Sequence, residues 1–262
     1  MPSRAKRVRP TPQLPGELIK AGSPWAARRS RATVIRLSWY LRQVQMMAQA
    51  GAVRISSQEL ADGLGVTAAQ VRKDLAAIGS LGHPGVGYRP QELAQAIRHV
   101  LGLDRQWSVV LVGVGNLGRA LVRYGGFRVQ GFQVVALFDS DPDKVGQEVE
   151  GLRIRPMEEL ASAVAELAAQ LAIITVPASA AQSVADRLVA AGIRGILNFA
   201  PVVLRVPPSV SLVSVDLTVQ LEQLAYLVLT SGRSYAKSAF ARPSYSVRAR
   251  RRTQESSPDL ET

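Results

Sequence analysis

Apolar side chains recur every three or four residues along residues 33–50, which predicts an amphipathic helix with its apolar stripe at Val34, Leu37, Leu41, Val44 and Ala48. Two shorter helices follow. Ser56-x-x-Glu59 and Thr67-x-x-Gln70 both have the pattern of a capping box, in which two side chains cap one helix start together. Two short helices joined by a glycine-containing turn are typical of a helix-turn-helix.

The second short helix has two contrasting faces. One face is apolar and is expected to pack inward: Ala68, Val71, Leu75 and Ile78. The opposite face is small and basic: Ala69, Arg72, Lys73 and Ala76. Small side chains let a backbone approach a groove of DNA, and the two cations can reach phosphates or base edges. An ordinary solvated helix face is the alternative.

The segment after these helices favours DNA binding. Four glycines within residues 79–88 predict a tight hairpin, and apolar spacing predicts another helix over residues 90–101. Helix, helix-turn-helix and hairpin follow one another in the order of a winged-helix domain. Residues 32–103 carry seven basic and four acidic side chains, a net charge of +3.

The second half of the chain alternates between apolar strands and helices, which predicts an α/β fold with a Rossmann-type, doubly wound parallel sheet. The predicted strands span residues 108–112, 133–138, 171–176 and 193–199, and the predicted helices span residues 119–124, 158–170 and 180–191.

The first of these strands leads into a glycine-rich loop, Gly113-Val-Gly115-Asn116-Leu117-Gly118. Between a strand and a helix, this pattern is the fingerprint of a dinucleotide-binding loop. Its glycines allow a tight turn, a close approach to a pyrophosphate and close helix–strand packing. Asp139 ends the next strand, where a carboxylate would bind the ribose hydroxyls and repel a 2′-phosphate. NAD and NADH are therefore expected as cofactors rather than NADP.

The later strand ends are expected to lie near the nicotinamide, at Thr175-Val176-Pro177 and at Asn198-Phe199-Ala200-Pro201. A hydride-transfer enzyme needs a proton donor or acceptor there, and these loops offer no obvious Lys or Tyr. The pattern predicts a sensor with no catalytic residue. Two alternatives remain: an NAD-dependent dehydrogenase with an appended DNA-binding domain, and a regulator that binds CoA or another nucleotide, which Asp139 disfavours.

The last helix, predicted over residues 216–230, has an apolar stripe at Leu217, Leu221, Leu224 and Val228. Such a stripe after a completed sheet indicates a contact between subunits. Packing back on its own domain is the alternative.

Composition adds limits to this picture. The 262 residues include 47% hydrophobic ones and carry a net charge of +12 (32 basic less 20 acidic). Residues 1–31 contribute +7 (eight less one) and residues 232–262 contribute +4 (seven less three), so we expect two basic disordered tails, either simply solvated or binding phosphates. No segment has the roughly 20 apolar residues that span a bilayer, and no signal peptide is evident. With zero cysteines and only two histidines, a metal site is not expected, and we predict a cytoplasmic protein without a membrane partner.

Several motifs together resemble redox-sensing transcriptional repressors of the Rex family, from about Ala32 to Leu229. The matching strings are residues 54–61, 70–75, 85–88, 113–118, 175–177 and 195–201. The resemblance implies a homodimer that exchanges its C-terminal helix, binds a palindromic operator and releases it when NADH binds. It also implies these DNA-binding residues: Arg54, Ser56, Gln70, Arg72, Lys73, His83 and Tyr88. An implied switch links Arg42, Tyr124 and Asp216, although a helix-capping role for Asp216 is the alternative.

On this reading, the winged-helix domain spans residues 32–103, the NAD(H)-binding domain residues 104–213 and the swapped helix residues 214–231. The chain departs from the family at three places. Aromatic residues are usual where Ala76, Ala77 and Ile78 stand, a wing cation where His83 and Pro84 stand, and an aromatic residue at Leu217. We hypothesise that the basic N-terminal tail partly replaces the wing cation.

Overall fold

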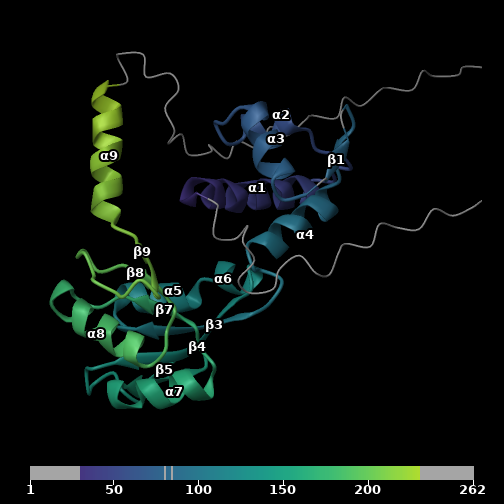
Figure 1. The fold of residues 1–262 in the computed structure, drawn as a ribbon. Coiled ribbons are helices and arrows are strands. Elements are labelled where there is room, and N and C mark those ends of the chain that lie inside the picture. Colours follow the sequence, from purple (N-terminus) through teal and green to yellow (C-terminus); the bar gives the residue numbers. More distant parts are fainter. Residues whose placement is uncertain (1–29, 80, 84, 231–262) are drawn as a thin grey trace, which may run out of the picture. The chain divides into compact units, whose positions relative to one another are not determined.

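A computed structural model describes residues 30–79, 81–83 and 85–230 and divides into two compact units between Leu101 and Gly102 (Figure 1). The segments predicted as basic tails lie outside the described residues, apart from Ser30 and Arg31.

The first unit is built from helices and a short hairpin. Its elements are α1 (Arg31–Gln49), α2 (Ser57–Asp62), α3 (Ala68–Ala76), β1 (Gly82–His83), β2 (Gly87–Tyr88) and α4 (Pro90–Val100). β1 and β2 pair antiparallel as the predicted wing, and Tyr88 of β2 also bridges to Ile55. This is the predicted winged-helix order.

The core of the first unit joins α1 to the other helices. From α1 it buries Leu37, Tyr40, Leu41 and Val44, and from α3 and α4 it buries Val71, Leu75, Leu93 and Ile97. Val34 was expected in this stripe but is 41% exposed, and Tyr40, which the apolar pattern missed, is fully buried. A tyrosine can be buried there because its hydroxyl has a partner, described below.

The two predicted capping boxes differ. Ser56 and Glu59 form a complete box at α2, with both reciprocal hydrogen bonds. At α3 the Thr67 hydroxyl accepts from the Gln70 N–H at 3.1 Å, but the Gln70 side chain turns to Asp74. Only half of the second capping box therefore forms.

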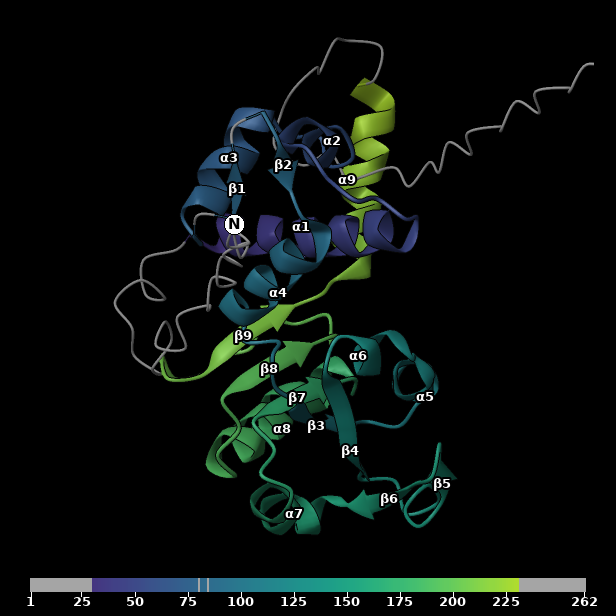
Figure 2. The same ribbon diagram turned by 90° about the vertical axis from the view of Figure 1, so that its right-hand side faces the viewer.

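The second unit is a seven-stranded sheet with helices on both faces (Figure 2). Its strands, in the order β5-β6-β4-β3-β7-β8-β9, are Glu148–Val149, Leu152–Pro156, Phe132–Asp139, Trp107–Val112, Leu171–Ile174, Gly195–Asn198 and Ser211–Ser214. Neighbouring strands are parallel except β5 and β6. The order runs in opposite directions on the two sides of β3, so a ligand site is expected at the carboxyl end of β3. The predicted fold class is confirmed.

The helices of this unit cover the two faces separately. α5 (Asn116–Arg123) and α6 (Gly126–Val129) contribute to one apolar cluster, and α7 (Leu160–Glu166) and α8 (Ala178–Ala190) to the other. The helix predicted over residues 158–170 is instead a 3-10 turn, η2 (Met157–Glu159), followed by the shorter α7. The sequence pattern missed α6, β5, β6 and β9.

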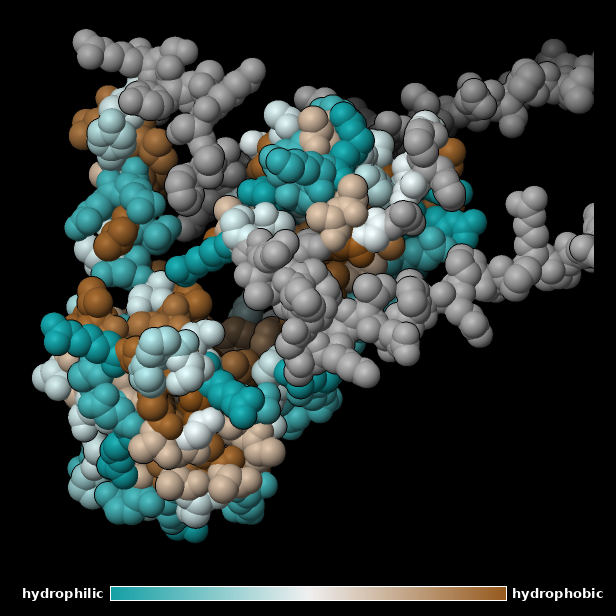
Figure 3. Space-filling model, in the orientation of Figure 1, coloured by the Kyte–Doolittle hydropathy of each residue, from teal (hydrophilic) through white to brown (hydrophobic). Residues whose placement is uncertain are grey.

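The last helix, α9 (Leu217–Thr230), buries none of its residues. Leu221 and Leu224 are 66% and 54% exposed, and apolar side chains of α9 lie on the surface in Figure 3. Packing back on its own domain, the alternative considered from the sequence, is therefore not observed. None of the helices in the described part of the chain is long and apolar enough to cross a membrane.

Candidate dinucleotide pocket and nucleic-acid interface

The loop after β3 contains three glycines, and the structure gives a different reason for the absence of a side chain at each one. Gly113 has φ of +96°, and a Cβ there would lie 2.8 Å from the Thr175 backbone. A Cβ on Gly118 would overlap the carbonyl oxygen of Gly113. Gly115 is different, because a Cβ there would meet no described atom within 4 Å. Protein packing therefore requires the first and third glycines, whereas the second leaves open space beside the start of α5.

Two side chains brace this loop. The Thr175 hydroxyl donates to the Gly113 carbonyl at 2.6 Å, and the Val114 N–H donates to Asp139 Oδ2 at 2.7 Å. The Gly113 N–H also donates to the Phe138 carbonyl at the end of β4. These bonds connect the loop to β4 and to the end of β7, so its shape is held by contacts within the chain.

Asp139 is 7% exposed, and its carboxylate is held by several donors. Oδ1 accepts from the Asp141 N–H at 3.0 Å, and Lys144 Nζ lies 3.4 Å from Oδ2. Burial alone would raise the pKa of Asp139, but the hydrogen bonds from the Asp141 and Val114 N–H groups and the charge of Lys144 bring it below its ordinary value. A negative charge is thus fixed at the floor of the site, beside a lysine.

The loop and the neighbouring strand ends line a pocket of about 400 Å³. Its wall includes these predicted residues: Gly113, Gly115, Leu117, Asp139, Thr175, Val176 and Pro177. Phe199, from the strand-end segment expected near the nicotinamide, also lines the pocket. Six lining residues were missed by the sequence reasoning: Val112, Ser140, Lys144, Met157, Ala180 and Val184. Ser140 and Lys144 could have been found, because they lie one and five residues after Asp139, in the loop that a ribose would approach.

Three predicted cofactor residues do not line the pocket: Asn116, Gly118 and Asn198. Asn198 is fully buried, and its amide binds the polypeptide itself. Its Nδ2 donates to the carbonyls of Ala200 and Val202, each at 3.1 Å, and its Oδ1 accepts from the Ala200 N–H. Asn198 thus holds the loop after β8, which carries the pocket residue Phe199.

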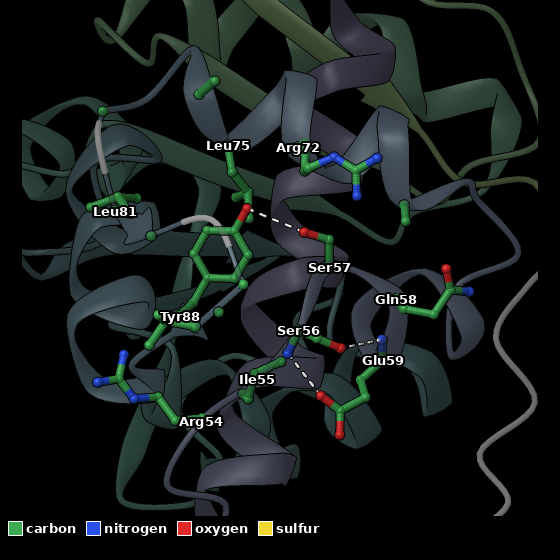
Figure 4. A pocket seen from close by; sticks show the side chains of 17 residues that line it. Arg54, Ile55, Ser56, Ser57, Gln58, Glu59, Arg72, Leu75, Leu81 and Tyr88 are labelled. Atoms are coloured by element: carbon green, nitrogen blue, oxygen red, sulfur yellow. Dashed lines mark hydrogen bonds between the residues drawn. The ribbon is translucent and has the colours of Figure 1, made fainter.

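In the first unit, α3 presents the predicted small, basic face. Ala69, Arg72, Lys73 and Ala76 are all exposed, whereas Val71 and Leu75 are buried. Arg72 borders a groove of about 680 Å³ between α2, α3 and the hairpin, which Figure 4 shows. Of the predicted DNA-binding residues, Arg54, Ser56, Arg72 and Tyr88 line this groove.

The hairpin is held against α2 at this groove. The Tyr88 hydroxyl lies 3.4 Å from the Ser57 hydroxyl, as Figure 4 shows. Gly87 has φ of +78°, and a Cβ there would lie 2.6 Å from the Ile55 carbonyl oxygen. Glycine is therefore required where the second wing strand crosses the start of α2.

Of the remaining predicted residues, those whose side chains the structure describes line neither pocket. Lys73 is on the exposed face of α3, Gln70 is half-buried and bonded to Asp74, and His83 is in β1. Arg42 is an exposed residue of α1 in the first unit. In the second unit, Tyr124 is 54% exposed and its ring makes an edge contact with Phe127.

Asp216 has the capping geometry considered as its alternative role. Its Oδ1 accepts from the N–H groups of Thr218 and Val219 at 2.9 and 3.2 Å, at the start of α9. In the described part of the chain, no cluster of three or more His, Asp or Glu side chains has the arrangement of a metal site.

Two family models match the two units. Residues 30–76 match "Putative DNA-binding protein N-terminus", and residues 104–202 match "CoA binding domain". Among solved structures, the chain is similar to RSP, a Rex-family repressor, in complex with β-NAD+ and operator DNA. That similarity has a TM-score of 0.74 and 36% identity and covers 78% of this chain and 94% of RSP. The complex of RSP with β-NADH gives a TM-score of 0.72 and 35% identity, covering 78% and 96%.

Curated relatives agree with this likeness. The redox-sensing transcriptional repressor Rex of Desulfitobacterium hafniense is 50% identical, over 76% of this chain and 95% of the relative. The Rex protein of Streptomyces coelicolor is 43% identical, over 87% of this chain and 90% of the relative. Identity at this level over nearly the whole of each relative shows the family: the chain belongs to the Rex family of redox-sensing transcriptional repressors.

Proposed function

We propose that this chain represses transcription according to the cytoplasmic balance of NADH and NAD, by binding palindromic operator DNA as a homodimer and leaving it when NADH binds. One observation carries the proposal. The same chain joins a winged-helix unit with an exposed basic α3 to a Rossmann unit whose phosphate loop is already formed. Family membership makes the chain a repressor rather than an enzyme.

NAD and NADH are the proposed cofactors. The open space beside Gly115 lets a pyrophosphate reach the backbone N–H groups at the start of α5, where the helix dipole favours negative charge. The fixed charge of Asp139 suits two ribose hydroxyls and opposes a 2′-phosphate. RSP, the similar repressor, has been solved with both β-NAD+ and β-NADH.

Operator DNA is the proposed partner of the first unit. We propose that α3 enters the major groove, where Arg72 and Lys73 contact phosphates or base edges, and that the hairpin lies along the neighbouring backbone. Arg54 and Tyr88, on the groove beside Arg72, would hold the DNA strand between α3 and the hairpin. The similar RSP complex contains operator DNA.

The homodimer is proposed to form through α9, because its apolar stripe is exposed in the single chain. Exchange of this helix between subunits, and a switch through Arg42, Tyr124 and Asp216, remain part of the proposal. The domain boundaries at residues 32–103, 104–213 and 214–231 belong to it too.

A mobility-shift titration of the full chain on candidate palindromes tests the proposal. NADH should release the DNA at concentrations at which NAD does not. Coupling between two ligands is reciprocal, so operator DNA should weaken NADH binding by the same factor, on the order of 5–150-fold. Equal NADH affinity with and without operator would refute the switch, and release by CoA but not by NADH would favour the CoA-binding alternative.

A further inference from the structure

Asp74, on the buried side of α3, binds four donors from two helices. It is 5% exposed. From α1, Arg36 donates through Nε at 2.6 Å and through Nη2 at 2.9 Å, and the Tyr40 hydroxyl donates at 3.0 Å. From α3 itself, Gln70 Nε2 donates at 2.9 Å. The carboxylate thus links α1 to the helix that carries Arg72 and Lys73.

The charge of this carboxylate is maintained despite its burial. Burial raises the pKa of Asp74, but the hydrogen bonds from Arg36, Tyr40 and Gln70 and the charge of Arg36 outweigh it, so the pKa lies below its ordinary value. An ionised carboxylate only accepts hydrogen bonds. Each group that faces Asp74 must therefore present a donor.

This requirement fixes the orientation of the Gln70 amide. The oxygen and nitrogen of a glutamine side chain are otherwise interchangeable in shape. Facing Asp74, Gln70 must turn its NH₂ inward, which leaves its Oε1 and its second N–H to other partners. Among the described residues, Oε1 accepts no hydrogen bond, and the side chain is half-buried at the third position of α3.

We propose that Gln70 reads an adenine in each operator half-site and that Asp74 is the positioning residue that presets its amide. A glutamine binds adenine in two places at once, accepting from N6 and donating to N7 in the major groove. Oε1 and the remaining N–H are the acceptor and donor that this contact needs. The N-terminal residues of a recognition helix are those that contact base edges. This inference rests on the DNA-binding function proposed above.

Selection from a randomised operator library tests the inference, using the full chain and three variants. Wild type should prefer adenine at one position of each half-site by roughly tenfold to a hundredfold. Gln70→Met, which keeps the length but lacks the amide, should lose the preference at that position alone. Asp74→Asn should lose the same preference, because an asparagine can accept from or donate to Gln70 and no longer fixes its orientation.

Asp186→Asn in α8 is the matched control. Gln182 Nε2 donates to Asp186 Oδ1 at 2.8 Å, the same pair at the same helical spacing but in the Rossmann unit. This variant should keep the wild-type base preferences.

Three outcomes would overturn the inference. Gln70→Met could keep every preference, Asp74→Asn could weaken binding equally at all base pairs with the profile unchanged, or the control could change the profile as Asp74→Asn does. If Asp74→Asn does not fold, Gln70→Glu replaces it, because a carboxylate can donate neither to Asp74 nor to adenine N7. If Gln70→Glu kept the adenine preference, that result would also contradict the inference. A wild-type chain that selects no sequence would remove the proposed DNA binding itself.

Discussion

Gly115→Ala should separate cofactor binding from folding. Gly115 has φ of −80°, which alanine adopts readily, and the added Cβ meets no described atom within 4 Å. Alanine is a poorer helix N-cap than glycine by about 1 kcal/mol. Restricting the unfolded chain offsets this by about 0.4–1 kcal/mol. The free energy of unfolding should therefore change by less than about 1 kcal/mol.

The same methyl group should impair NADH binding. It would occupy the space through which a pyrophosphate reaches the start of α5. A hydrogen bond to a charged group contributes about 1.5–3 kcal/mol. Losing one such bond raises the Kd about tenfold or more, since 1.4 kcal/mol corresponds to a factor of ten. We expect this loss for NADH and for NAD alike, because both carry the pyrophosphate.

Thermal unfolding and a fluorescence titration with NADH measure the two effects separately. Gly118→Ala is the control, because its Cβ overlaps the Gly113 carbonyl oxygen and should cost about 1–3 kcal/mol of stability. A Gly115→Ala chain that folds normally and binds NADH with wild-type affinity would refute the assignment of this loop to the pyrophosphate.

Three further predictions concern charge and assembly. Arg72→Ala should weaken operator binding and make the slope of the logarithm of the DNA-binding constant against log salt concentration shallower by about 1. Arg128→Ala on α6 is the control and should leave this slope unchanged. Equal slopes for the two variants would exclude a phosphate contact by Arg72. Leu221→Asp with Leu224→Asp should convert the proposed dimer to monomers in light scattering, because each leucine buried at an interface contributes about 1.5–3 kcal/mol. An unchanged mass would count against α9 as the contact between subunits. Burial raises the pKa of Asp139, but its hydrogen bonds and the charge of Lys144 outweigh burial, so the pKa in the folded state lies below the unfolded value. The ionised Asp139 therefore stabilises the fold above about pH 4, and this contribution is lost as the pH falls through the folded-state pKa. Asp139→Asn should flatten that part of the pH–stability curve in urea unfolding, and a curve that keeps its acid limb would contradict this.

The sequence pattern predicted long elements with one clear periodicity and missed short or polar ones. β3 and α8 were within two residues of their observed bounds, because apolar spacing and flanking turns agree there. β6 was missed because arginines alternate with its apolar residues, as suits a strand near the sheet edge. β9 is only four residues long and half serine. Tertiary contacts therefore determined the elements that local pattern could not.

The site was predicted where a motif has a backbone requirement. Gly113 and Gly118 are needed for reasons that spacing encodes, a turn and a close packing. Asn198 was expected at the pocket but does not line it, because a strand-end asparagine looks the same in sequence whether its amide faces a ligand or its own loop. Asp74 was overlooked for a related reason. A charged residue on an apolar helix face signals a buried network only once its partners, 34 and 38 residues away, are placed beside it.

The construction of the phosphate loop also restricts where the redox signal can arise. Thr175 and Asp139 hold the loop in place through hydrogen bonds within one chain, so little binding energy is needed to order it. A ligand shifts an equilibrium only by its difference in affinity for the two states. A preformed loop that contacts the pyrophosphate contributes equally to NAD and NADH, which share that group. Discrimination between NADH and NAD must therefore come from the part of the pocket that meets the nicotinamide. We expect Pro177 and Phe199 there, and Asn198 holds the loop that carries Phe199 in place.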